Sequence, residues 1–205
     1  MVRYTFSQVR ACRPAVVTRL ARTLGVATHP LLMLSVHVSS LPADALLQSY
    51  VASGAYTDCY VVAFPGQVSL AEFIAAFYTT RIFRSERWLL ARFLHFPSTD
   101  DQAQLLGQGK LTRFAAWHVE SRQSNQVIMA AGRTRSWLMA SALPTSSQTT
   151  ALYFGSAVVH RRRGGLGWQF NALLGFHKVY SRVLLASAAK RLVKTRHGPH
   201  ARSDA

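Results

Sequence analysis

The stretch LGWQFNALLGFHKVYSRVLLASAAKRLV, residues 166–193, decides the fold of this chain. Its apolar residues recur mostly at intervals of three and four, the spacing that predicts a long helix with one apolar side. The members of this stripe are Phe170, Leu173, Leu174, His177, Tyr180, Leu184, Ala188 and Leu192. A helix of this length that follows a series of strands has to bury such a stripe against the sheet that those strands form.

The residues upstream of this helix alternate between apolar and polar side chains, which is the pattern of half-buried strands. The predicted strands are residues 113–121, 126–131, 134–142 and 149–159. The segments between them are short and rich in turn-forming residues, so neighbouring strands are expected to pair as an antiparallel meander. An earlier strand is predicted at residues 57–64, where Pro65 and Gly66 form the turn that ends it.

Helical patterns fill the remaining sequence. Ser69 and Glu72 have the spacing of a capping box, which predicts a helix over residues 69–80. Other helices are predicted between Pro42 and Gly54, over residues 83–96 and over residues 101–106. The combined expectation is an α+β domain in which a twisted antiparallel β-sheet wraps around a long C-terminal α-helix.

The composition is that of one folded domain. The 205 residues can bury a single sizeable core, and 49% of them are hydrophobic. The domain is expected at residues 41–194, between a basic extension at 1–40 and a basic disordered tail at 195–205. For residues 1–28, which contain five arginines and no acid, three interpretations stay open: an amphipathic targeting or surface segment, a disordered basic tail, and a start codon placed too far upstream. The apolar run at residues 30–38 has about half the length of a membrane span, which favours a strand or a buried turn.

The net charge of +16 is concentrated near the ends of the chain. Residues 160–205 carry ten basic residues and one acidic residue, whereas residues 58–159 carry nine basic and six acidic residues. Such ends predict non-specific, salt-sensitive adhesion to nucleic acid or to an anionic membrane surface. The charge alone therefore defines no specific partner.

Two cysteines, Cys12 and Cys59, occur without a CxxC motif or paired histidines. Neither a disulfide framework nor a zinc site is predicted, and a reducing compartment fits best. The glycines at 164–167 lack the Lys-Ser/Thr pair of a phosphate loop, and no dinucleotide-binding glycine motif follows a strand. We therefore expect a cytoplasmic protein with no cofactor and no metal, and the oligomeric state is left open.

Four segments carry a resemblance to a known family: AYTDCYVVAFPG (55–66), FAAWHVESR (114–122), AGRTRSWLMA (131–140) and GFHKVYSRVLL (175–185). In these segments, and in its order of elements, the chain resembles a bacterial domain family of unknown function. That family belongs to the START-like, or SRPBCC, superfamily of polyketide-cyclase-like helix-grip proteins. The resemblance spans about residues 41–193. It implies a helix-grip fold and an apolar or amphipathic ligand held between the sheet and the long helix, but it assigns no catalytic residue.

Aromatic and polar side chains on the presumed inner faces are the candidates for contact with such a ligand. These ligand-binding candidates are Trp117, Arg135, Trp137, Tyr153, His177 and Tyr180. If the face that Arg135 shares with Trp137 is concave, the arginine needs an anion, which is either a ligand carboxylate or Glu120. The alternative is that Arg135 packs over Trp137 on a solvent-exposed face. His177 is either a ligand-binding or proton-transferring group, or a core histidine bonded to a backbone carbonyl or to Tyr153.

No catalytic constellation is apparent in the sequence. No carboxylate is obviously placed to orient His177, and the candidate nucleophiles Ser141, Ser156 and Cys59 lack an activating partner. Three arginines precede the terminal helix, where they form either an anion-binding site or a solvated linker. They are Arg161, Arg162 and Arg163.

The sequence is compatible with three functions. The favoured hypothesis is a binding protein for a small hydrophobic or amphipathic molecule, without confirmed catalysis. The second is an electrostatic binder of nucleic acid or of an anionic membrane through the Arg-rich ends. The third is an enzyme of the cyclase or hydratase kind in which His177 is essential.

Overall fold

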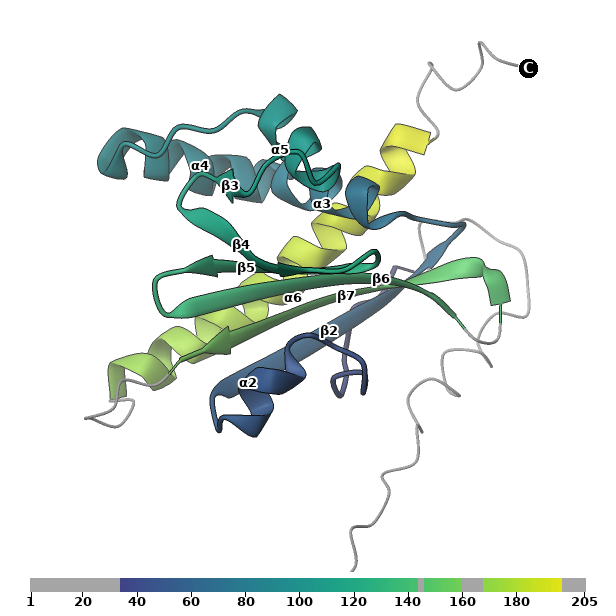
Figure 1. Cartoon of the computed structure of the whole chain (residues 1–205), viewed down its shortest axis with the longest axis horizontal. Coiled ribbons are helices and arrows are strands. Elements are labelled where there is room, and N and C mark those ends of the chain that lie inside the picture. The colour runs from purple at the N-terminus through teal and green to yellow at the C-terminus, as the bar shows by residue number, and fades with distance from the viewer. Residues whose placement is uncertain (1–33, 144–145, 160–167, 197–205) are drawn as a thin grey trace, which may run out of the picture.

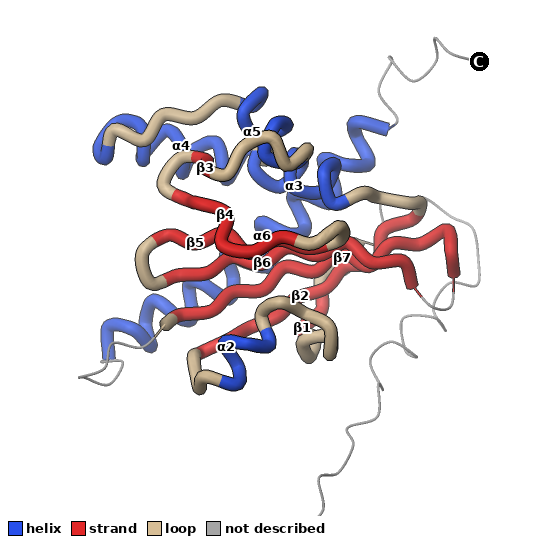
Figure 2. Tube along the Cα trace, in the orientation of Figure 1, coloured by secondary structure: helices blue, strands red, loops and turns tan. Residues whose placement is uncertain are grey.

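An antiparallel sheet of seven strands forms the centre of the molecule (Figures 1 and 2). The structure, a computed structural model, describes residues 34–143, 146–159 and 168–196, with the backbone alone for 146–147 and 168–176. The strands are β1 (His37–Val38), β2 (Tyr56–Pro65), β3 (Arg113–Phe114), β4 (Trp117–Arg122), β5 (Gln126–Ala131), β6 (Thr134–Leu143) and β7 (Ser146–Val158). Their order in the sheet is β1-β2-β7-β6-β5-β4-β3. The helix α6 (Trp168–Arg196) packs against this sheet, so the predicted helix-grip arrangement is confirmed.

The larger core lies between the sheet and the helices α3 (Leu70–Tyr78) and α6. Its central side chains are at most 3% exposed: Val62, Phe64, Phe73, Ile74, Phe77, Leu138, Leu152, Phe154, Leu184, Leu185, Ala188 and Leu192. Each large apolar side chain buried in this way contributes about 1.5–3 kcal/mol to folding. From Leu184 to Leu192 the apolar stripe of α6 therefore has the packing role that its spacing predicts.

The opposite face of the sheet is covered by residues 41–52, which end in the short helix α2 (Gln48–Ala52). The helix is shorter than predicted because Gln126 binds the backbone of the residues before it. The Gln126 Oε1 accepts from the Leu46 N–H at 2.8 Å, and its Nε2 donates to the Asp44 carbonyl at 2.9 Å. These backbone groups are thereby satisfied outside a helix.

The predicted strand 113–121 is wrong as a single element. It forms two strands, β3 and β4, that pair with each other through Phe114 and Trp117. The turn between them contains Ala115 in the left-handed region, with φ 48°. Alanine gives no sequence signal for such a turn, which is usually marked by Gly or Asn.

The helix termini follow the predicted capping chemistry. Ser69 and Glu72 form the capping box of α3, and Thr99 forms a second one with Gln102 at the start of α5 (Asp100–Gly107). The helix α4 (Arg81–Leu94) begins after Thr80 and ends at His95, whose φ is 58°. All three helices thus begin after a residue whose hydroxyl accepts a backbone N–H of the first turn, since Thr80 accepts from the Phe83 N–H at 3.2 Å.

Residues 34–40 belong to the fold, although the sequence assigned them to the extension. Leu34 is buried in the larger core, and His37 and Val38 pair with Val61 and Tyr60 of β2. The ordered domain therefore begins before residue 41. No helix within the described part of the chain is long and apolar enough to cross a membrane.

Candidate ligand-binding groove

A groove of about 580 Å³ runs along the outer edge of β2. Its walls come from residues 38–51, from the first half of β2 and from α6. The side chains most relevant to binding are Val38, Leu41, Val51, Tyr56, Lys178 and Arg182. Apolar and cationic groups therefore share one open groove.

The groove exists because β1 covers only part of the β2 edge. The Ser39 N–H donates to the Cys59 carbonyl at 3.0 Å, after which the chain leaves the sheet towards α2. Outward-facing backbone groups alternate along an edge strand, so the N–H and C=O of Thr57 also point outward, into the groove. Polar backbone atoms are thus available at the groove floor.

Lys178 and Arg182 supply the positive charge of the groove. They lie one helical turn apart on α6, and neither forms an ion pair with a residue that the structure describes. The Arg182 guanidinium lies 5.5 Å from the centre of the ring of Tyr60, which also lines the groove. An acidic group of a bound molecule could pair with these two cations.

A polar cluster lies at the wall of the groove where β2, β7 and α6 meet, and its carboxylate, Asp58, lines the groove. Asp58 Oδ1 accepts hydrogen bonds from the Ser156 N–H at 3.0 Å and from the Ser156 hydroxyl at 2.7 Å. The same hydroxyl lies 2.8 Å from Nε2 of His177, and that nitrogen is 3.7 Å from Asp58 Oδ2. The expectation that no carboxylate lies near His177 is therefore wrong, and Ser156 does have polar partners.

This cluster has the residue types of a catalytic triad but a different arrangement. The Ser156 proton is donated to Asp58, so the hydroxyl oxygen accepts from His177, which places a proton on Nε2. A serine nucleophile needs that nitrogen as a proton acceptor. Ser156 is also only 3% exposed, which keeps a substrate away from it. The geometry favours a structural link between α6 and the sheet over nucleophilic catalysis.

A second polar contact joins α6 to α4. The Tyr180 hydroxyl donates to Glu86 Oε2. Burial raises the pKa of Glu86, and the hydrogen bond from Tyr180 and the charge of His177 only partly oppose this shift. Burial and the neighbouring Glu86 carboxylate likewise raise the pKa of Tyr180. These groups form an interior network beside the groove, without contributing to its lining.

Three of the predicted ligand-binding residues lie on the wrong face of the sheet for a cavity under α6. Trp137 and Tyr153 belong to the cluster beneath residues 41–52, where Trp137 Nε1 donates to Gln126 at 2.9 Å. Arg135 lies on the same face. Alternation puts Leu138, and not Trp137, towards α6, because successive strand residues face opposite sides.

Arg135 has a partner within the protein. Its Nε lies 2.6 Å from Glu120 Oε2 and donates to the Tyr50 hydroxyl at 2.9 Å. The Tyr50 hydroxyl in turn donates to Glu120. Of the two anions that the sequence allowed for Arg135, a ligand carboxylate and Glu120, the structure shows Glu120. The arginine connects α2 to the sheet and does not pack over Trp137.

Of the other predicted site residues, three lie in described elements and three lie outside the described part of the chain. Trp117 is half-buried against Phe83, with ring centres 5.3 Å apart. His177 and Tyr180 lie on α6 in the polar contacts described above. The proposed anion site of Arg161, Arg162 and Arg163 lies outside the described residues.

Cys59 is buried at the groove and is not a candidate nucleophile. Burial, together with the nearby Asp58, raises the pKa of its thiol to about 12. Within the described ranges no cluster of His, Cys, Asp and Glu side chains has the geometry of a metal site.

The sequence patterns did not identify Asp58, Lys178 and Arg182 as candidate site residues. A signal for Asp58 was present, because it alternates with Tyr60 and Val62 and must share their core-facing side. The groove itself had no signal, since it depends on where β1 leaves the edge of β2.

Comparison of the chain with protein-family models, with curated proteins and with solved structures gives no match.

Proposed function

We propose that the protein binds a small amphipathic molecule with an acidic group, in the groove beside β2. The observation that carries this proposal is that Lys178 and Arg182, which form no ion pair with a described residue, share one groove of about 580 Å³ with apolar side chains. Volumes of this size are typical of small-molecule sites. Val38, Leu41 and Val51 would contact the apolar part of the ligand, and the two cations its acidic group.

The interior between the sheet and the second half of α6 is a poorer candidate for the ligand. From Leu184 to Leu192 the core-facing side chains of α6 pack directly on the sheet and on α3. Close packing of this kind leaves no room for a ligand without displacing side chains. The edge groove is therefore favoured over the deep cavity implied by the resemblance.

Membership of the START-like superfamily is part of the same proposal. Its support is the order of a first strand, helices, meander and terminal helix, together with the four segments quoted above. Fold alone assigns no ligand, so the groove chemistry carries the functional argument. The electrostatic alternative rests on the charge of the chain ends, most of which lie outside the described residues.

The test is a competition assay with 1-anilinonaphthalene-8-sulfonate, an anionic probe whose fluorescence rises on binding. Octanoate should displace the probe more strongly than octanol, which has the same chain length without the charge. The double variant Lys178→Ala/Arg182→Ala should bind octanoate about tenfold more weakly, since charge-assisted hydrogen bonds are lost.

The matched control is Lys190→Ala/Lys194→Ala, which removes two exposed cations from the same helix outside the groove. This control should bind octanoate like the unmodified protein. Equal loss in both variants would mean that binding follows total charge and that the groove is not the site. Octanol competing as well as octanoate would exclude the acidic group from the proposal.

A further inference from the structure

The second half of α4 and the residue pair after it expose a cluster of large apolar side chains. These are Trp88, Leu89, Phe93, Leu94 and Phe96, each between 45% and 65% exposed. Single exposed apolar residues are common on protein surfaces, but five large ones within nine residues are a local concentration of exposed apolar area. We call this set the α4 patch.

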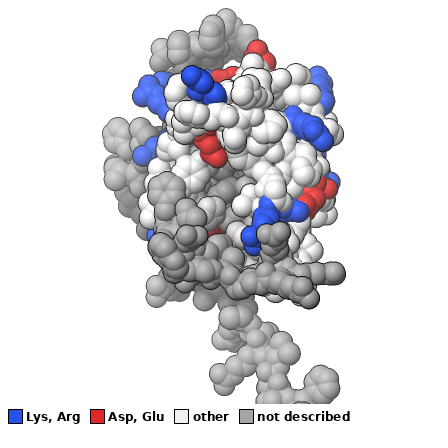
Figure 3. All heavy atoms as spheres, turned by 90° about the vertical axis from the view of Figure 1, so that its left-hand side faces the viewer, with Lys and Arg blue, Asp and Glu red and all other residues white. Residues whose placement is uncertain are grey.

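The α4 patch projects from the body of the molecule. In Figure 1 the far end of α4 extends beyond the strands of the sheet. Figure 3 views the molecule from that side, and in its upper part both basic and acidic side chains lie on a largely uncharged surface. The first half of α4, by contrast, is anchored through buried Phe83.

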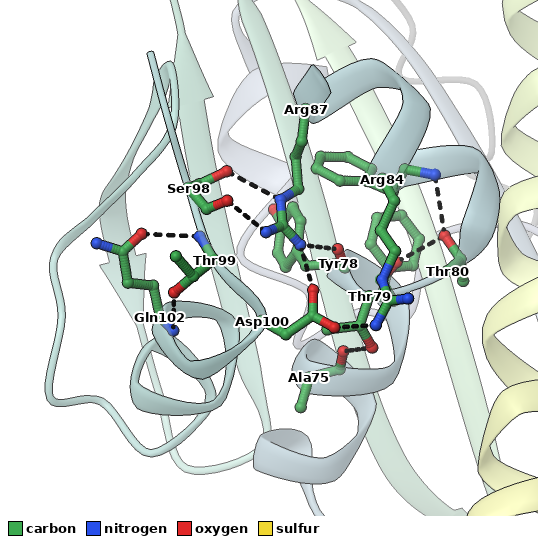
Figure 4. Close-up of polar contacts among 12 residues, drawn as sticks. Ala75, Tyr78, Thr79, Thr80, Arg84, Arg87, Ser98, Thr99, Asp100 and Gln102 are labelled. Atoms are coloured by element: carbon green, nitrogen blue, oxygen red, sulfur yellow. Dashed lines mark hydrogen bonds and ion pairs between the residues drawn. The ribbon is translucent and has the colours of Figure 1, made fainter. Parts of the chain in front are cut away.

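A buried arginine holds this projecting end in place (Figure 4). Arg87 donates to the Ser98 hydroxyl at 2.9 Å, to the Ser98 carbonyl at 2.5 Å and to the Tyr78 carbonyl at 3.3 Å. It also pairs with Asp100 at 2.7 Å. The segment that follows the patch is thereby tied back to the body of the protein, so the apolar side chains are presented on a fixed helix.

On α4 the arginines outnumber the one acid, Glu86, and the acids Asp100 and Asp101 follow the patch at the start of α5. Arg81 and Arg92 are exposed on α4 and form no ion pair with a described residue, whereas Arg84 pairs with Asp100. The one acid of α4, Glu86, bonds inward to Tyr180. The solvent-facing side of the helix thus combines Trp, Phe and Leu with arginine and with no carboxylate of its own.

We infer that the α4 patch binds the surface of an anionic lipid bilayer. Aromatic side chains take positions at the boundary between head groups and acyl chains, and arginines pair with lipid phosphates. A second copy of this chain is a poorer occupant, because two molecules of net charge +16 repel each other. The inference is independent of the proposed ligand groove, whose residues lie on other elements.

The experiment is co-sedimentation of the full chain with vesicles of phosphatidylcholine alone or with phosphatidylglycerol added. It is run at about 0.1 M and about 0.5 M NaCl, because salt screens the exposed charges of the basic ends but not apolar insertion. The protein should bind the anionic vesicles and retain part of this binding at the higher salt. Trp88→Ser/Phe93→Ser should lower the partition coefficient about tenfold or more, since apolar area is removed from the contact.

Val179→Ser/Val183→Ser is the matched control, because these valines are also exposed but lie on α6. It should bind vesicles like the unmodified protein. Brominated lipid should quench tryptophan fluorescence, and Trp88→Phe should remove most of that quenching. Both α4 variants should keep the unmodified circular dichroism spectrum and melting temperature, since the altered side chains are exposed.

Unchanged vesicle binding by Trp88→Ser/Phe93→Ser would overturn the inference and assign membrane adhesion to the charged ends. Quenching that persists in Trp88→Phe would overturn it too. A dimer in sedimentation equilibrium that the same double change dissociates would instead identify the patch as a contact between two copies, and would also exclude the lipid interpretation.

Discussion

Ala115 illustrates how one residue can limit the stability of a turn. Ala115 lies in the two-residue connection between β3 and β4, and its φ is 48°. This left-handed conformation costs a non-glycine residue about 1–2 kcal/mol. Glycine reaches this conformation without a steric penalty but loses more chain entropy on folding. The balance of the two effects is open to measurement.

Ala115→Gly should raise the free energy of unfolding by about 0.5–1 kcal/mol, because the steric relief exceeds the added entropy cost. Urea denaturation followed by circular dichroism measures the change. Ala116→Gly is the control, since Ala116 has no positive φ and should lose a similar amount of stability. A loss of stability in Ala115→Gly would contradict the turn geometry.

Glu86 is a second residue whose side chain alone affects the stability of the fold, in this case in a pH-dependent way. Its raised pKa means that the folded protein holds this proton more tightly than the unfolded chain does. Stability from this group is therefore present below the ordinary pKa of glutamate and is lost as the pH rises through the raised value. At neutral pH the buried charge is a net cost.

Glu86→Gln should stabilise the protein at pH 7 by about 1 kcal/mol, because it keeps an acceptor for Tyr180 and removes the buried charge. The gain should shrink towards pH 4, where Glu86 itself becomes protonated. Melting temperatures of both proteins across this range give the comparison. A gain of equal size at both pH values would show that ionisation of Glu86 is not its cause.

At the scale of elements, α3, α4 and α5 are joined by Arg87. Its guanidinium reaches a carbonyl near the end of α3, the loop after α4 and the first residue of α5. It also stacks over the Phe114 ring at 5.3 Å. Burial opposes the ionisation of Asp100, but Arg87 and Arg84 outweigh it and lower the pKa of its carboxyl.

Arg87→Ala should lower the free energy of unfolding by about 3–5 kcal/mol, because it leaves the Tyr78 and Ser98 carbonyls without their donor and leaves Asp100 paired with Arg84 alone. Chemical denaturation measures this loss. Arg92→Ala, an exposed position on the same helix, should change stability by no more than about 0.5 kcal/mol. Similar small effects in both variants would mean that the three helices are held by their apolar contacts alone.

Element boundaries were predictable where capping residues mark them. Ser69 begins α3 as its capping-box spacing with Glu72 predicts. The short α2 was not predictable, because its length depends on Gln126, which is 80 residues from Leu46 in the sequence. Local patterns describe what a segment can form, and distant side chains determine how much of it forms.

At the scale of the whole molecule, the sheet is covered on both faces. The larger core faces α3 and α6, and the smaller one faces residues 41–52. This second layer explains why Trp137 and Arg135 are not available to a ligand under α6. It also leaves the first half of the β2 edge open, which creates the groove.

The sequence by itself determined the antiparallel meander, the long terminal helix and the alternation of faces along each strand. These features depend on the spacing of apolar residues over a few positions, which the chain carries locally. Only the tertiary structure decided which layer covers each face and which polar groups meet. Asp58 and Ser156 are 98 residues apart, and their contact depends on the register of β2 against β7. Such registers arise from the packing of the complete fold, because each strand pattern alone is compatible with several partners.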